Sequence, residues 1–154
     1  MDVLLFIYDF YPAWLIKLLC LAVAALMVLT IHAYMTMANA RLAAAKAGKV
    51  TADTYKATTN EPDEVAVFAR AVANLFEMPV MFYALVIMSL TVGTASWITV
   101  ILAWAYVILR FIHFKELTSS NDVLRRRKIF FYSTYAFMAL LAEFVIALLF
   151  SSLV

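Results

Sequence analysis

The sequence predicts an all-α membrane protein, a bundle of four transmembrane helices in one domain of residues 1–154. Its composition is 67% hydrophobic and 14% charged, whereas soluble domains carry about 25% charged residues. Four apolar runs each exceed the roughly 18 to 20 residues that cross a hydrocarbon core, and they are too long for strands. They are apolar on all sides, which excludes a soluble bundle with charged faces. The expected helices span about 14–47, 61–91, 95–117 and 121–153.

The first helix is expected to remain in the chain, because Asp2 and Asp9 stand where a signal peptide has a basic start. The alanine-rich stretch 40–47 favours helix beyond the membrane. Gly48 then predicts the helix end, because glycine readily adopts the left-handed conformation that follows a helix. Within this helix, His32 is expected to be a core histidine bonded to a neighbouring helix.

The second helix is preceded by a polar stretch, 50–59, that predicts a loop. Asn60 and Pro62 are typical of a helix start, as a capping amide and a proline in the first turn. Pro79 lies inside the helix and has no N–H to bond the carbonyl of Leu75. We therefore expect a kink near this proline.

The third helix is expected to follow a tight turn at Gly93. The fourth should be capped by Ser119, Ser120 or Asn121, because short polar side chains bond the free N–H groups of a helix start. Glu143 lies deep in the fourth helix, where a lone carboxyl group needs a partner. We interpret it as a hydrogen-bond partner of a neighbouring helix.

The distribution of positive charge predicts the orientation in the membrane. Lys and Arg accumulate in cytoplasmic loops, and two connections hold nine of the twelve in this chain. Both connections are therefore expected in the cytosol, with both termini on the other side. A compact chain without targeting signals favours a bacterial inner membrane with periplasmic termini over the endoplasmic reticulum. The nine residues are Arg41, Lys46, Lys49, Lys56, Lys115 and residues 125–128.

Polar residues gather at one depth in the cytosolic half of the predicted bundle. Arg70, Asn74 and Glu77 are spaced i, i+4, i+7 and share one helix face. Arg110 and His113 lie about one turn apart on the third helix. An Arg–Glu pair that only joins helices would explain part of this set. The surplus of cations, however, predicts a bound anion, because a buried charge needs a partner.

The arginine run 125–127 begins the fourth helix at the cytosolic surface. Such residues often contact anionic headgroups. Three consecutive residues fan over about 200° of a helix, so at most two can face the bundle. Which of Arg125, Arg126 and Arg127 faces the bundle is left open by this geometry.

Two of these segments resemble sequence motifs of a known family. RAVANLFEMP at residues 70–79 resembles the R-x-x-x-N-x-x-E…P signature of the MAPEG proteins, the membrane-associated proteins in eicosanoid and glutathione metabolism. RFIH at residues 110–113 resembles the R-x-x-H/Y element of their third helix. The four-helix topology is similar over the whole chain. The resemblance is to a bacterial-type member.

The resemblance implies a homotrimer that binds glutathione as a co-substrate in the cytosolic leaflet, between adjacent subunits. It implies membrane lipid and a hydrophobic small-molecule substrate as further partners, with no nucleic acid and no metal. By analogy Glu77 would bind the ammonium group of glutathione, and a fourth-helix arginine would stabilise its thiolate as the catalytic residue. We select Arg126 for this role, with Arg125 and Arg127 as alternatives. The other residues assigned by resemblance are Arg70, Arg110 and Arg41 for the carboxylates, and Asn74 and His113 for hydrogen bonds to glutathione or those arginines.

Three functions remain open at this point. The cation surplus favours a glutathione transferase or peroxidase acting on lipophilic electrophiles. Leu117 stands where eicosanoid-forming members have tyrosine, which favours a non-catalytic protein that binds lipid or a partner membrane protein. Finally, His32 and His113 are expected at similar depth and could hold a haem as its two axial ligands.

Overall fold

The computed structural model of the chain describes residues 11–51, 53–57 and 61–150. All regular secondary structure within these ranges is helical. Four of the described helical segments are long and apolar enough to cross a membrane. The prediction of a multi-pass membrane protein with a four-helix bundle is confirmed at this level. The four segments are Ala13–Lys46, Asp63–Thr91, Trp97–Thr118 and Val123–Phe150.

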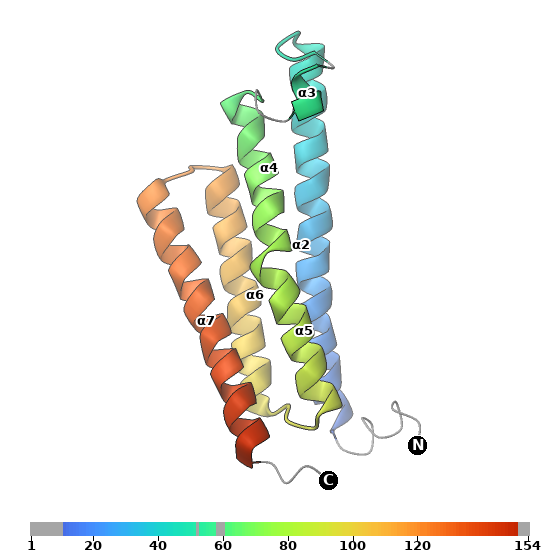
Figure 1. Ribbon diagram of the computed structural model, residues 1–154, viewed down its shortest axis with the longest axis vertical. Helices are drawn as coiled ribbons and strands as arrows, with labels where there is room; N and C mark the ends of the chain where they lie inside the picture. The colour runs from blue at the N-terminus through green and yellow to red at the C-terminus, as the bar shows by residue number, and fades with distance from the viewer. Residues whose placement is uncertain (1–10, 52, 58–60, 151–154) are drawn as a thin grey trace.

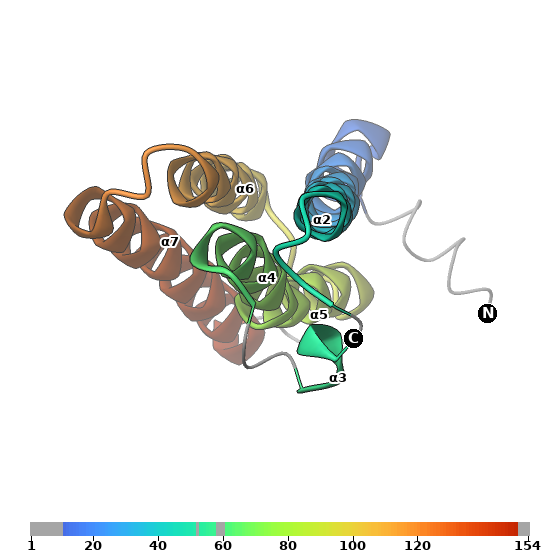
Figure 2. The ribbon, with the colours of Figure 1, turned by 90° about the horizontal axis from the view of Figure 1, so that it is seen from above.

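Successive spans run in opposite directions along the bundle (Figure 1). The connections after the first and third spans therefore lie at the same end, called here the basic end because both are rich in Lys and Arg. From this end, the start of the second span lies centrally, with the first and third spans packed against it (Figure 2). The helices are α2 (Ala13–Lys46), α3 (Thr54–Ala57), α4 (Asp63–Phe76), α5 (Met78–Thr91), α6 (Trp97–Thr118) and α7 (Val123–Phe150).

The end of α2 agrees with the prediction to within one residue. Gly48 adopts the left-handed conformation, with φ of 68°, and the Lys49 N–H donates to the Ala44 carbonyl at 3.0 Å. This bond satisfies a carbonyl that the helix end would leave free. The connection that follows contains the short helix α3, which the polar composition of this stretch did not predict.

The second span is broken into α4 and α5 at Glu77, whose φ of −88° and ψ of −91° are not helical. Pro79 lies in the first turn of α5, where its missing N–H costs little. The predicted kink is confirmed, and the break is sharp enough to end one helix and begin another. Asn60, the predicted cap, lies outside the described residues, and Pro62 directly precedes α4.

The starts of the last two helices have well-defined caps. The Gly93 turn, with φ of 82°, leads to Ser96, which caps α6 through a capping box with Thr99. The expected cap of the fourth helix was wrong: Asp122 caps α7, and its Oδ1 accepts from the N–H groups of Leu124 and Arg125. Asp122 is adjacent to the predicted candidates and is a stronger partner, because its charge also complements the helix dipole.

The core is a column of apolar and aromatic side chains between α2, α4, α5, α6 and α7. Tyr106 at its centre is fully buried; its ring stacks on Phe82 at 4.9 Å between centroids and contacts Phe137 at 5.8 Å. Such aromatic contacts each contribute about 0.5–1.5 kcal/mol beyond area burial. The core therefore fixes the rotation of α6, and with it the direction of the polar residues further along that helix.

Candidate functional site

A groove of about 300 Å³ opens between α4, α6 and α7 near the basic end. It is called the Arg126 groove below. Its size is at the lower limit of ligand pockets, about 300–1,000 Å³. Four of the seven residues that the sequence assigns to a glutathione site line it, although they come from three helices. The lining residues are Arg70, Asn74, His113, Leu117, Val123, Arg126, Arg127 and Phe130.

The α4 side of the groove carries Arg70 and Asn74, one turn apart as their spacing predicts. Arg70 is exposed and makes no hydrogen bond or ion pair with any described residue. The side-chain amide of Asn74 is likewise unpaired within the described part of the chain. Both groups are therefore available to a ligand without breaking an existing contact.

The α6 side is more tightly packed. His113 is 5% exposed, and its ring lies 5.7 Å from that of Phe130 on α7. Leu117, one turn further along α6, is 2% exposed and presents an apolar side chain to the groove. This wall offers one imidazole and otherwise hydrocarbon, so it suits the less polar part of a ligand.

The start of α7 separates its three consecutive arginines. Arg126 and Arg127 line the groove. Arg125 turns away and pairs with Glu116, with 3.3 Å between Nε and Oε2. The choice of Arg126 as a groove-facing arginine agrees with this geometry, and Arg127 accompanies it.

Arg110 is 1% exposed and lies behind the groove. Its Nη2 donates to the backbone carbonyl of Asn74 near the end of α4. The break at Glu77 leaves carbonyls without helical partners, and a cation at a helix C-terminus also complements the dipole. Arg110 therefore closes the end of α4, a structural role that the motif alone did not reveal.

Glu77 is exposed at the break between α4 and α5 and does not line the groove. It interacts electrostatically with Arg110 but forms no ion pair with a described residue. In a single chain its carboxylate thus lies at membrane depth without a close partner.

Arg41 also lies outside the Arg126 groove. It pairs with Glu61, with 2.6 Å between Nη2 and Oε1, and its guanidinium carbon is 5.4 Å from the centre of the Tyr55 ring. These contacts place it in a groove of about 830 Å³ between α2 and α4, called the α2–α4 groove. Arg70 lines both grooves, so the two are neighbours.

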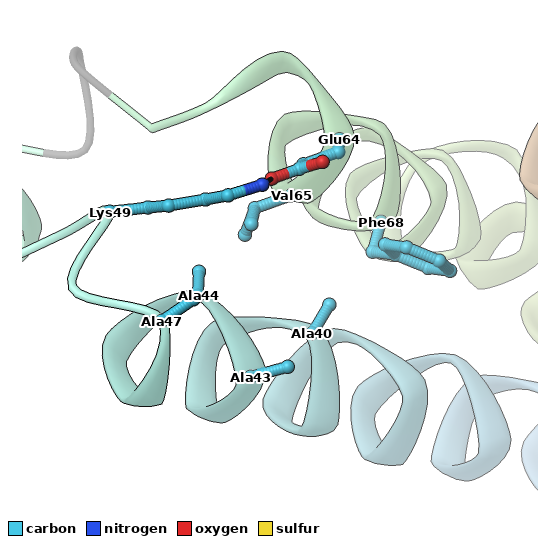
Figure 3. Close-up of a pocket in the computed structure, with 8 residues that line it drawn as sticks. All are labelled: Ala40, Ala43, Ala44, Ala47, Lys49, Glu64, Val65 and Phe68. Carbon is cyan, nitrogen blue, oxygen red and sulfur yellow. Dashed lines mark hydrogen bonds and ion pairs between the residues drawn. The ribbon is translucent and has the colours of Figure 1, made fainter.

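The charges distinguish the Arg126 groove from another hollow at the basic end. That hollow, of about 350 Å³, lies between the alanines at the end of α2 and the start of α4 (Figure 3). Its charged residues, Lys49 and Glu64, pair with each other at 2.6 Å. The Arg126 groove has three arginines and no carboxylate in its lining. An anion therefore complements the Arg126 groove and not this hollow.

His32 does not occupy the predicted core position. It is exposed on α2, where its ring contacts Phe114 at 5.7 Å, and it lines a separate, mostly apolar groove with Lys115. The core interpretation was wrong because α2 buries the adjacent face, which includes Leu29 and Ala33. The two histidines line different grooves, which argues against their holding one haem.

Sequence reasoning missed Val123 and Phe130 as groove residues. They lie three before and four after Arg126, on the same face of α7. This spacing was available once Arg126 had been chosen. Asn121 and Glu116, which hold two of the arginines, could not be found this way, because their contacts depend on the path of the α6–α7 connection.

The model of the MAPEG family matches residues 18–148, a range that includes α4, α5, α6 and every residue lining the Arg126 groove. Searches of curated proteins and of solved structures found no match to this chain. The family match spans well over half of the sequence and agrees with the four apolar helices. The chain therefore belongs to the MAPEG family.

Proposed function

We propose that this protein binds glutathione in the Arg126 groove and uses its thiol in a transferase or peroxidase reaction on lipophilic electrophiles. The observation that carries the proposal is the charge of the groove lining, in which Arg70, Arg126 and Arg127 surround one cavity that no carboxylate lines. Glutathione has two carboxylates and a thiol, and arginine is well suited to bind carboxylates through paired hydrogen bonds.

The positions suggest a role for each arginine. Arg70 and Arg127 have no partner among the described residues. They would bind the carboxylate of the glycine end, because the other carboxylate shares its carbon atom with the ammonium group and would lie near Glu77. Arg126 would lie beside the sulfur, because a nearby cation favours thiolate and can lower a thiol pKa of about 8.5 by a unit or more. Asn74 and His113 would donate or accept hydrogen bonds. Arg110, being buried behind the groove, would act through Asn74.

Glu77 fits this proposal as the partner of the ammonium group. It lies about 10 Å deeper than Arg70 along the second span, and an extended tripeptide is about 10 Å long. A glutathione molecule lying along α4 would therefore reach from one residue to the other. The bound glutathione would then extend beyond the groove. A neighbouring subunit of a homotrimer would supply the wall that covers this part of the molecule.

The electrophile would reach the groove from the bilayer. Val123 and Leu124 are exposed apolar residues at the start of α7, and Val123, Leu117 and Phe130 form apolar walls of the groove. Lipophilic compounds partition into the hydrocarbon core, whereas glutathione would enter from the cytosol. We propose the bacterial inner membrane with periplasmic termini. Labelling with an impermeant thiol reagent at Thr51→Cys but not Val92→Cys, from the cytosolic side, would test this orientation.

A non-catalytic member is the second candidate, and one contact favours it. Leu117 is buried in the groove wall and gives the thiol side no hydroxyl group. Such a protein would bind lipid or a partner membrane protein in place of glutathione.

Glutathione titration of the purified protein in detergent tests the proposal, together with conjugation of a chlorodinitrobenzene-type substrate. We expect saturable binding and a thiolate absorbance that Arg126→Gln abolishes. Lys128→Gln is the matched control, because Lys128 is an exposed cation close by that does not line the groove. Folded wild-type protein with neither binding nor thiolate would refute the proposal. Binding without conjugation or peroxide reduction would favour the non-catalytic alternative.

A further inference from the structure

The end of α6 and its connection to α7 provide different partners for two arginines of the run 125–127. Glu116, 7% exposed, pairs with Arg125 at 3.3 Å and also accepts a hydrogen bond from Ser120 Oγ. Arg126 Nη1 donates to Asn121 Oδ1 at 2.5 Å. Arg125 thus pairs with a carboxylate of opposite charge, whereas Arg126 is held by a neutral amide.

The backbone fixes the position of Asn121. Its φ is +50°, and its N–H donates to the Glu116 carbonyl at 2.9 Å. Among the described residues other than glycine, Asn121 is the one with a positive φ. Asparagine adopts this conformation more readily than most residues. The following residue, Asp122, caps α7 and accepts from the Arg126 N–H at 2.9 Å. Both ends of the Asn121–Arg126 contact are therefore anchored.

We propose that Asn121 is a positioning residue for Arg126, and that it directs the guanidinium of Arg126 toward the thiol of a bound glutathione. This inference rests on the proposed function. A long arginine at a helix start has many rotamers, and helix geometry alone does not aim it into the groove. One amide oxygen restrains one N–H and leaves the other donors of the guanidinium for the ligand.

Asn121→Gly is the variant that isolates the amide. Glycine adopts positive φ without strain, so the turn is kept while the contact with Arg126 is lost. Glu116→Gln is the matched control, because it alters the partner of Arg125 and leaves Asn121 in place. The two variants should affect different arginines.

The first measurement requires no glutathione. Purified protein is treated with phenylglyoxal, which modifies arginine, and the rate at each of Arg125, Arg126 and Arg127 is read by peptide mass spectrometry. We expect Arg126 to react several-fold faster in Asn121→Gly, and Arg125 to react faster in Glu116→Gln. Equal Arg126 rates in wild type and Asn121→Gly would overturn the proposed contact.

The second measurement follows thiolate absorbance against pH with saturating glutathione. A cation held at the sulfur lowers the pH at which thiolate forms, so we expect the midpoint to rise by about one pH unit in Asn121→Gly. Glutathione affinity should change less than about threefold, since the amide does not line the groove. An unchanged midpoint would overturn the positioning role. If wild type itself forms no thiolate, the proposed function fails and the role in thiol chemistry fails with it, whereas the modification rates still decide the contact.

Discussion

The charged and polar residues of the two family motifs have different roles, which their degree of burial distinguishes. Arg70 is exposed with no partner among the described residues, whereas Arg110 is 1% exposed and bonded to the Asn74 carbonyl. His113 and Arg110 are three residues apart, about 60° around α6, and this difference places one in the groove and the other behind it. Spacing predicts a shared face, but only packing decides which edge of the face reaches a cavity.

Arg110→Met tests the structural role of this residue. It removes the donor at the end of α4 and leaves a partly buried carbonyl unpaired, so we expect a loss of about 1–3 kcal/mol in stability. Thermal unfolding in detergent measures it. Arg127→Met is the control and should unfold near the wild-type temperature, because Arg127 has no partner within the described residues. Unchanged stability in Arg110→Met, with weaker glutathione binding, would instead indicate a ligand contact.

The helices themselves were largely predictable. Apolar length gave four spans, Gly48 gave the end of α2, and Pro79 gave the break in the second span. These features are determined by the residue types within one short segment of the chain, so they can be predicted without knowing how the segments pack. The cap of α7, the short helix α3 and the surroundings of Arg41 depend on how the connections fold back, and no local pattern encodes that path.

Glu143 was predicted to bond a neighbouring helix, and this is confirmed. Its Oε1 accepts from Ser96 Oγ at 2.8 Å and from Thr99 Oγ1 at 2.9 Å. Since Ser96 also caps α6, the contact joins α7 to the start of α6. The bundle is thereby joined at the end opposite the Arg126 groove.

Glu143→Ala should separate these two helices at that end. Two interhelical hydrogen bonds are lost, and we expect a cost of about 1–3 kcal/mol in thermal unfolding. Glu143→Gln keeps an acceptor oxygen and should lose much less. Neither variant should change glutathione binding, because the contact is at the far end of the bundle. Equal stability of Glu143→Ala and wild type would contradict the role.

At the scale of the whole molecule, the surface of a single chain is mostly apolar, as expected for a protein in a bilayer. Arg70 and Glu77 are exceptions, because both are exposed on the second span. A charged side chain at the bilayer centre costs about 2.5–3.5 kcal/mol on insertion scales. Beside them, Ala66, Ala69 and Ala73 line the α2–α4 groove, and small residues allow close helix packing in membranes. A partner group supplied by another copy of the chain would lower this cost.

We therefore predict that the chain assembles through the surface that contains these alanines. Ala73→Phe places a large ring where close packing needs a small residue, and we expect it to shift the proposed trimer toward monomer in native mass spectrometry. Ala139→Phe is the matched control, since Ala139 is also exposed but lies on α7, outside the α2–α4 groove. Loss of the trimer should also weaken glutathione binding, because Glu77 would lose the wall that faces it. A wild-type protein that is monomeric yet binds glutathione normally would show that the Arg126 groove is complete within one chain.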